Sequence, residues 1–228
     1  MKKIMFNDKY RLTEAVLLGR KTQTRRIIEC PKKICGTEVY GFHAYRRAST
    51  NVIEEVCCFD DDESDIEGGQ ILPKYKIGEI VAIAQSYSSI VDELEDPKNF
   101  CCMEHWESAS GDRAHYCGYL EHPGFTNKMF VSADKMPHQI RITNVRIERL
   151  QDISHGDCKR EGIELSATEN RIGYPFGIPF KYFFGEDKPG CRYTTPREAY
   201  ASLIDKISGK GTWESNPFVF VYDFELVK

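Results

Sequence analysis

The segment LLGRKTQTRRII, residues 17–28, gathers several cationic side chains in a chain that is acidic overall. Apolar side chains recur at helical spacing in the residues that lead into this segment, which predicts a helix. We expect Asn7 or Asp8 to cap it. Gly19 stands where a helix commonly ends in a left-handed residue. The cationic segment is therefore predicted to begin at the C-terminal end of a helix.

Charge is distributed unevenly along the chain. Residues 1–33 hold ten Lys and Arg against three Asp and Glu, a net charge of +7, and because the whole chain carries −4 the remaining residues carry −11. A polyanionic partner met at one site fits this asymmetry, whereas a protein that coats nucleic acid is normally basic throughout.

Three interpretations of Arg20, Lys21, Arg25 and Arg26 compete. Exposed and charged, they would contact phosphates in a salt-dependent, sequence-independent way. Gathered around a pocket, the arginines would lower the pKa of Lys21 by repulsion and hold an anionic or carbonyl-bearing substrate. At a helix C-terminus they would also compensate the helix dipole, without further function. The residues alone leave all three open.

Alternating apolar residues predict three strands, within residues 76–87, 138–150 and 216–227. Ser154 is expected to cap a short helix that Gly162 ends. The motif Thr195-Pro196, with Glu198 completing a capping box, predicts the clearest helix of the chain.

Short strands separated by short helices, without a regular strand–helix–strand repeat, favour a small α+β barrel over a doubly wound sheet. The glycine-rich dinucleotide and phosphate loops, the zinc-protease motif and the serine-hydrolase elbow are absent from the sequence. The function classes that depend on them have no support.

Segment 30–75 reads as an insertion, and segment 88–127 reads as a second irregular stretch. The first contains an acidic run, residues 54–67, without a single Lys or Arg. Such a run is typical of a solvated loop.

Nine cysteines, an odd number that includes two adjacent pairs, occur in a chain without a signal-peptide pattern. We therefore expect reduced thiols and a cytoplasmic protein. No apolar run approaches the roughly 20 residues of a membrane helix, which argues against a membrane partner.

Cys101, His105, His115 and Cys117 are of the types that ligate zinc, but their spacing matches no common finger or ribbon. We read them as unligated residues of an insertion, near Trp106 and Tyr116, which we expect to pack locally. No metal and no cofactor is predicted.

The segment GRKTQTRR resembles the signature of the ASCH domain family, with Gly19, Lys21, Thr24 and Arg26 at the motif positions. Further similar segments follow in the family's order: KIGEIVAIAQSY (76–87), a central strand with a short helix (136–163), and a closing strand (211–227). Together they cover about half of the chain. The resemblance implies one PUA-like β-barrel domain over residues 1–228, with short flanking helices and with insertions at 30–75, 88–127 and 165–194, similar to the enlarged members carried by phages and prophages.

The resemblance implies recognition of RNA or of a modified nucleoside. One bacterial branch of the family is an amidohydrolase that removes acetyl from N(4)-acetylcytidine with a Lys, a Thr and a Glu. Lys21 and Thr24 match this branch directly, and Glu161 matches by order and by its spacing to the short helix. These three are the candidate catalytic residues, as base, nucleophile and acid respectively.

The chemistry of this trio is reasonable on its own terms. A threonine hydroxyl is a weak nucleophile that needs a base, and the leaving amine needs a proton from an acid. Lys21 must be neutral to act as the base, so its pKa must fall from about 10.4 to near 7, at a cost of roughly 4 kcal/mol. Burial and neighbouring arginines are the expected causes.

Five residues are candidates for contacting the substrate or nucleic acid: Gly19, Arg20, Arg25, Arg26 and Gln85. Many relatives carry an Arg-Glu pair where this chain has Ala84-Gln85. Gln85 can read a base edge by hydrogen bonds but cannot act as an acid or a base. A non-catalytic, phage-derived interaction module, with the acidic run as its contact, remains the third functional alternative. The sequence does not indicate an oligomeric state.

Overall fold

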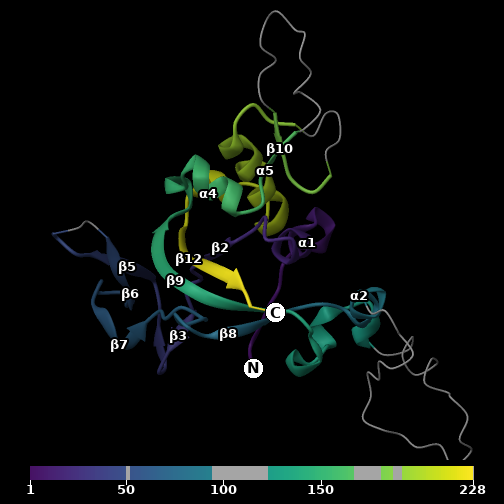
Figure 1. The fold of residues 1–228 in the computed structure, drawn as a ribbon. Helices are drawn as coiled ribbons and strands as arrows, with labels where there is room; N and C mark the ends of the chain where they lie inside the picture. Colours follow the sequence, from purple (N-terminus) through teal and green to yellow (C-terminus); the bar gives the residue numbers. More distant parts are fainter. Residues whose placement is uncertain (50–51, 94–122, 167–180, 187–191, 228) are drawn as a thin grey trace, which may run out of the picture. The chain divides into compact units, whose positions relative to one another are not determined.

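The structure is a computed structural model that describes five stretches of the chain: residues 1–49, 52–93, 123–166, 181–186 and 192–227. It is a mixed α+β fold in which most strands are antiparallel (Figure 1). The chain divides into two compact units. Unit 1 comprises Met1–Phe6, Ile80–Arg141 and Leu226–Lys228, and unit 2 comprises Asn7–Glu79 and Ile142–Glu225.

Unit 1 is built on the predicted strand of segment 76–87. β8 (Ile80–Ile83) pairs in parallel with β1 (Lys3–Ile4) and antiparallel with the first residues of β9 (Gln139–Arg149). The remaining elements are short: helix α2 (Tyr87–Asp92) and the 3-10 helices η4 (Pro123–Phe125), η5 (Lys128–Phe130) and η6 (Ala133–Lys135).

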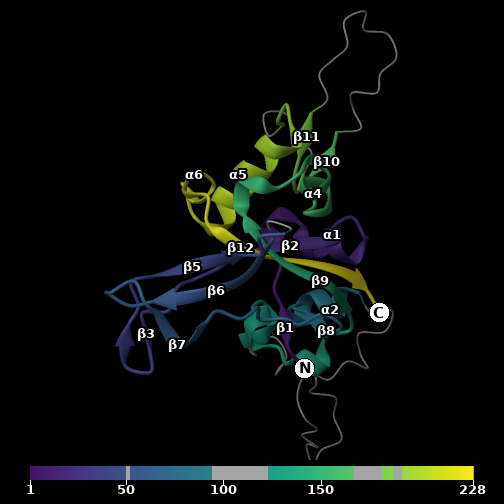
Figure 2. The ribbon, with the colours of Figure 1, turned by 90° about the vertical axis from the view of Figure 1, so that its left-hand side faces the viewer.

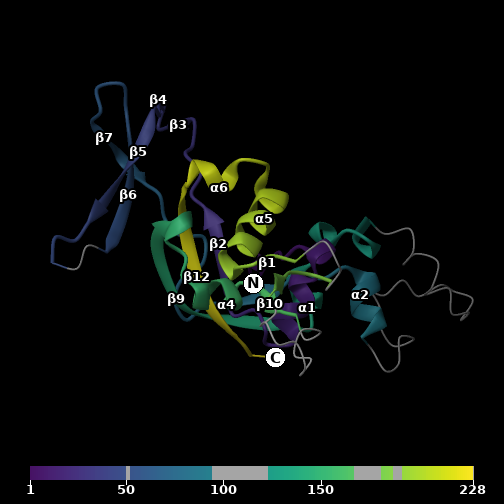
Figure 3. The ribbon, with the colours of Figure 1, turned by 90° about the horizontal axis from the view of Figure 1, so that it is seen from above.

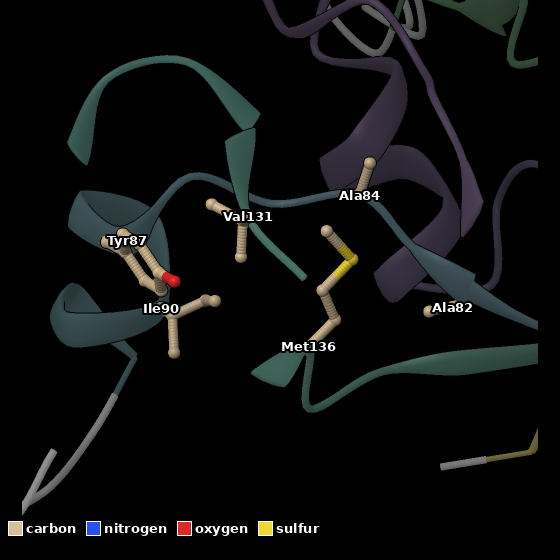
Figure 4. Close-up of a cluster of buried hydrophobic side chains, with 6 residues drawn as sticks. All are labelled: Ala82, Ala84, Tyr87, Ile90, Val131 and Met136. Atoms are coloured by element: carbon tan, nitrogen blue, oxygen red, sulfur yellow. The ribbon is translucent and has the colours of Figure 1, made fainter. Parts of the chain in front are cut away.

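The core of unit 1 joins these short helices to β8. Figure 4 shows the Met136 side chain between Tyr87 and Ile90 of α2 and the alanines Ala82 and Ala84. All of these residues are almost completely buried. The flexible thioether suits a core whose other side chains differ so much in size.

Unit 2 contains the longer part of β9 and the predicted closing strand. β12 (Phe218–Leu226) lies between β9 and β2 (Gln23–Ile27), with Tyr222 opposite Thr24 and Asp223 opposite Gln23. The inner residues of β12 are buried, as its apolar, aromatic composition predicts.

A second group of strands extends this sheet through β6 (Ile53–Phe59), where Ile53 pairs with Ile147 of β9. β6 lies between β5 (Gly41–Arg46) and β7 (Asp65–Gln70). Figures 2 and 3 show this group of strands apart from the helices of unit 2. A small hairpin of β3 (Lys33–Ile34) and β4 (Thr37–Glu38) completes the segment.

The expectation that residues 54–67 form a solvated loop is wrong in its secondary structure. Most of the run belongs to β6 and β7, and only the turn between them is irregular. The acidic run can form a strand because Val56 and Cys58 alternate with its polar residues and are fully buried on one face of the sheet. The acidic residues at 60–63 remain largely exposed, as expected.

The N-terminal helix of unit 2 differs from its prediction. A 3-10 turn, η1 (Asp8–Tyr10), precedes α1 (Leu12–Leu17), and Arg11 between them takes a left-handed conformation with φ of 53°. Neither Asn7 nor Asp8 caps the helix, and Asp8 instead accepts a hydrogen bond from the Thr13 hydroxyl. The predicted left-handed Gly19 is confirmed, with φ of 69°.

The later helices agree with their start and stop signals. α4 (His155–Arg160) follows the 3-10 turn η7 (Leu150–Asp152) and is capped by Ser154. α5 (Pro196–Ser208) is capped by Thr195 and precedes α6 (Thr212–Ser215). Two short strands, β10 (Glu164–Leu165) and β11 (Tyr182–Phe183), pair with each other.

The predicted α+β class is confirmed, but the described strands are not assigned as a closed barrel. Much of the segments 88–127 and 165–194, including the candidate zinc ligands, Trp106 and Tyr116, lies outside the described residues. In the described stretches, no helix is both long and apolar enough to cross a membrane. The cysteines that the structure describes are all free thiols: Cys30, Cys35, Cys57, Cys58 and Cys158.

Candidate functional site

Lys21 and Glu161, two of the three candidate catalytic residues, are in direct contact inside unit 2. The Lys21 Nζ donates to Glu161 Oε2 at 2.6 Å and to the Glu161 main-chain carbonyl at 2.8 Å. The two residues are only 2% and 4% exposed. A residue just after α1 therefore forms a buried ion pair with a residue 140 positions later.

The end of α4 brings Glu161 to this position. The Ser154 hydroxyl accepts from the Asp157 backbone N–H at 3.0 Å and so fixes the start of the helix. Gly162 then ends it with φ of 98°, a conformation that favours glycine. A Cβ at Gly162 would lie 3.7 Å from the Lys21 side chain, so the chain reversal packs directly against the lysine.

Arg25 holds the other oxygen of the Glu161 carboxylate. Its Nη1 donates to Glu161 Oε1 at 3.0 Å and to Gln23 Oε1 at 2.6 Å, and its Nε donates to Glu148 at 3.1 Å. The Arg25 side chain is fully buried. The Arg25 guanidinium therefore donates its hydrogen bonds to acceptors within the protein.

These contacts belong to a larger network that we call the charge cluster. It consists of four cations and four anions of unit 2: Lys21, Arg25, Arg146, Arg160, Glu148, Asp157, Glu161 and Asp223. The charges within it balance. Arg146 joins Asp223 at 2.6 Å to Glu148 at 3.2 Å, and the fully buried Gln23 donates to both Asp157 and Asp223.

Burial lowers the pKa of Lys21 below its ordinary value, although Glu161 acts in the opposite direction. Repulsion by Arg26 and Arg25 adds to the lowering, as the cationic segment predicts. For Arg25, burial is outweighed by Glu161 and Glu148, and its pKa is raised. Burial, followed by Glu161, raises the pKa of Tyr200, so this phenol stays protonated beside the pair.

Thr24, the third candidate catalytic residue, is 5% exposed and lies on the opposite face of β2 from Gln23 and Arg25. Its opposite neighbour is Tyr222, and Arg26 shares its face. The hydrogen bonds and ion pairs given above for the charge cluster do not involve Thr24. The structure thus joins Lys21 to Glu161 and leaves the threonine hydroxyl outside the charge cluster.

The face of Thr24 is aromatic and cationic. The rings of Tyr75 and Tyr222 meet edge to face with centroids 5.3 Å apart, and the Tyr222 hydroxyl accepts from the Lys74 backbone N–H. Arg26 lies close enough to act electrostatically on both phenols and on Lys21. Arg26 therefore links the aromatic face to the lysine of the charge cluster.

The remaining predicted binding residues have different positions. Arg20 is 35% exposed in its side chain and pairs with Glu164 and with Glu14, the latter at 3.3 Å. Gly19 provides the turn that precedes it. Gln85 belongs to unit 1, where its Nε2 donates to Glu93 at 2.6 Å, and Glu93 also contacts His138 at 2.8 Å.

Sequence reasoning named Glu161 but missed the other three anions of the charge cluster, Glu148, Asp157 and Asp223. Asp223 offered a signal, because it is the one acidic residue between the aromatic positions of the closing strand. Asp157 offered a weaker one, in the first turn of a helix with a recognisable cap. Within the described ranges, no group of three or more His, Cys, Asp or Glu side chains is arranged to hold a metal ion.

Comparison of this chain with protein-family models, with curated proteins and with solved structures found no match.

Proposed function

We propose that unit 2 recognises a modified nucleoside, free or within RNA, through Lys21, Thr24 and Glu161, and that the reaction it supports is hydrolysis of an amide on a cytidine-like base. The observation that carries this proposal is the buried contact of 2.6 Å between Lys21 Nζ and Glu161 Oε2. A lysine with a lowered pKa beside a carboxyl group is the kind of pair that acid–base catalysis uses. The ASCH-like motif supports the same assignment.

The proposed reaction has two steps. In the reacting state the proton shared by Lys21 and Glu161 resides on Glu161, which leaves the amine of Lys21 neutral. This amine accepts the proton of the Thr24 hydroxyl as its oxygen attacks the acetyl carbonyl, and the C–N bond breaks as the base nitrogen receives the proton of Glu161. Water then hydrolyses the acetyl–threonine ester and releases acetate. Arg25 would act as a positioning residue, because it holds the Glu161 carboxylate by the oxygen that Lys21 does not contact.

The pairing of the cations favours a nucleobase over a run of phosphates as the recognised group. Lys21 and Arg25 are buried against carboxylates, and Arg20 has two carboxylate partners. Phosphate contacts would have to break these pairs. By contrast, the face with Thr24, Arg26 and Tyr222 combines a hydroxyl, a cation and aromatic rings, which suit an unstacked base.

The test is release of acetate from N(4)-acetylcytidine by the purified protein and by Lys21→Ala, Thr24→Ala and Glu161→Gln variants. We expect activity in the wild type and its loss in all three variants. Thr24→Ser keeps a hydroxyl and should retain activity. Arg11→Ala, at an exposed cation outside the charge cluster, is the matched control.

Circular dichroism and thermal unfolding identify any variant that has lost its fold. If folded Thr24→Ala and Glu161→Gln proteins hydrolyse the substrate at the wild-type rate, the catalytic assignment is wrong. If the wild type is inactive but binds N(4)-acetylcytidine by calorimetry, and Lys21→Ala abolishes that binding, recognition without hydrolysis is the correct form of the proposal.

A further inference from the structure

The sheet of β5, β6 and β7 has one face that the core of unit 2 does not use. Directly opposite residues of antiparallel strands project to the same side, and the register pairs Gly41 with Phe59, His43 with Cys57 and Tyr45 with Glu55. Asp65 of β7 lies opposite Phe59 and joins this side. The other side carries the fully buried Val56 and Cys58.

Aromatic rings form an ordered platform on this face. The Phe59 ring lies across Gly41 so closely that a Cβ at Gly41 would come within 2.5 Å of it. His43 stacks on Phe59 with ring centroids 4.5 Å apart and an interplanar angle of 26°. Tyr45 meets His43 edge to face at 6.1 Å. The absence of a side chain at Gly41 is what allows the platform to form.

Carboxylates border the platform. Asp65 accepts a hydrogen bond of 2.6 Å from the Tyr45 hydroxyl and lies 3.5 Å from Nδ1 of His43. On β6, Glu55 accepts from the Cys57 thiol at 3.3 Å. The side chains of His43 and Asp65 are 41% and 42% exposed, and Tyr45 is 43% exposed, so rings and carboxylate both reach solvent.

The pKa values of two side chains on this face are raised, in part by neighbouring carboxylates. The hydrogen bond to Asp65 raises the pKa of Tyr45 to about 12. Burial, followed by the contact with Glu55, raises the pKa of Cys57 to about 11. A carboxylate is the main cause of the raised pKa for Tyr45 and the second cause, after burial, for Cys57. We call the side formed by His43, Tyr45, Glu55, Phe59 and Asp65 the acidic face.

The sequence of β6, β7 and the turn between them is strongly acidic. Residues 48–73 contain no Lys or Arg and eight acidic residues: Glu54, Glu55, Asp60, Asp61, Asp62, Glu63, Asp65 and Glu67. Arg47 forms an ion pair at the edge of this segment, with Glu54. A nucleic acid would be repelled here, whereas a cation would be attracted both by the carboxylates and by the faces of the rings.

We propose that the acidic face binds an arginine- or lysine-rich segment of a partner protein, with one cationic side chain placed over His43 and Tyr45 and paired with Asp65. Aromatic rings beside carboxylates are the side chains that recognise alkylammonium and guanidinium groups. Charge complementarity selects a basic polypeptide as the occupant. This inference is independent of the reaction proposed above, because none of its residues belongs to the charge cluster or to the face of Thr24.

The experiment measures fluorescence anisotropy of a short labelled peptide of alternating arginine and glycine, titrated with the full chain. A peptide of alternating glutamate and glycine is the charge-reversed control, and spermine is the competitor. Tyr45→Ala removes a ring, Asp65→Asn removes the central carboxylate, and Asp61→Asn removes the same charge from the exposed turn between β6 and β7. All three positions are exposed, so the fold should persist.

We expect the arginine peptide to bind, the glutamate peptide not to bind, and added salt to weaken the complex. Tyr45→Ala and Asp65→Asn should each weaken binding about two- to five-fold, and Asp61→Asn much less. The proposal is overturned if Asp61→Asn and Asp65→Asn have equal effects, since the attraction is then diffuse. It is also overturned if Tyr45→Ala has no effect, or if spermine displaces the peptide as readily from Tyr45→Ala as from the wild type.

Discussion

The charge cluster and the acidic face bear the same types of ionisable side chain in opposite environments. In the cluster, four cations and four anions are brought together from β2 and the turn before it, β9, α4 and the residue after it, and β12, and its centre, Arg25, is fully buried. On the acidic face, Asp65 is 42% exposed and no Lys or Arg occurs from residue 48 to residue 73. One set of charges is satisfied internally, and the other is directed to solvent.

The difference shows that the location of charge in the sequence does not predict whether that charge is paired within the fold. The N-terminal cationic segment reads as a site for a polyanion, yet Arg20, Lys21 and Arg25 have carboxylate partners within the fold. The acidic run is predicted to be a solvated loop, yet it forms strands and borders an aromatic platform. The fold decides which charged side chains are paired with one another and which remain exposed to solvent.

The largest expected effect comes from removing the centre of the charge cluster. Arg25→Met leaves Glu161 and Glu148 with fewer partners in a buried site, and we expect it to lower the free energy of unfolding by about 3–5 kcal/mol. Urea unfolding measures this value. Arg47→Ala, which breaks the exposed pair with Glu54, is the control and should cost less than about 1 kcal/mol. If Arg25→Met and Arg47→Ala lose equal free energy of unfolding, the buried cluster and the exposed pair do not differ in their contribution to stability.

The next effect is the coupling between Lys21 and Glu161. In a double-mutant cycle of Lys21→Met and Glu161→Gln, we expect the double variant to be more stable than the sum of the single losses predicts, by about 1–3 kcal/mol. The reason is that each single variant leaves a buried polar group without its partner. Additive losses would mean that the 2.6 Å contact contributes no specific interaction.

A smaller effect concerns pH. Burial lowers the pKa of Lys21 in the folded protein, whereas the unfolded chain keeps the ordinary value of 10.5. Between the two pKa values the unfolded chain binds more protons, so this residue makes stability rise with pH across that window. Relative to Lys21→Met, the wild type should therefore gain stability from neutral pH toward 10.5, measured by urea unfolding. A difference that stays constant or falls would contradict the lowered pKa.

The smallest effect is expected on the acidic face. Asp65→Asn should change the free energy of unfolding by no more than about 0.5 kcal/mol, because the residue is exposed. The same substitution should lower the pKa of Tyr45 from about 12 toward its ordinary value of 10, since the hydrogen bond to the carboxylate is the main cause of the shift. The difference in tyrosinate absorbance between variant and wild type, followed through an alkaline titration, tests this.

Elements with a clear local signal were predictable from the sequence. The periodicity of β8, β9 and β12, the Ser154 and Thr195 caps, and the left-handed Gly19 all depend on neighbours within a few residues. The split at Arg11 was not predictable, because the bond between Thr13 and Asp8 competes locally with the expected cap.

For the candidate site, the types of residue were predictable but their partners were not. The pocket interpretation of the cationic segment required a lowered pKa for Lys21, and burial in the fold lowers it. The partners of Arg25 lie on β9 and α4, 123 and 136 positions away, and no local pattern in a single sequence relates such residues. The strands β6 and β7 were missed because their many acidic side chains resemble a solvated segment, while only Ile53, Val56 and Cys58 mark the buried side.

The pairing of β2 with β12 has a consequence for how the chain is made. Gln23 and Asp223 are 200 positions apart, so the sheet around the charge cluster cannot close until the ribosome has released nearly the whole of that length. At about 5–20 residues per second, the cationic segment waits many seconds for its carboxylates. A polypeptide that stalls before β12 would contain Glu148, Asp157 and Glu161 but would lack Asp223 and the strand with which β2 pairs, so the cationic segment would not yet be held in the sheet.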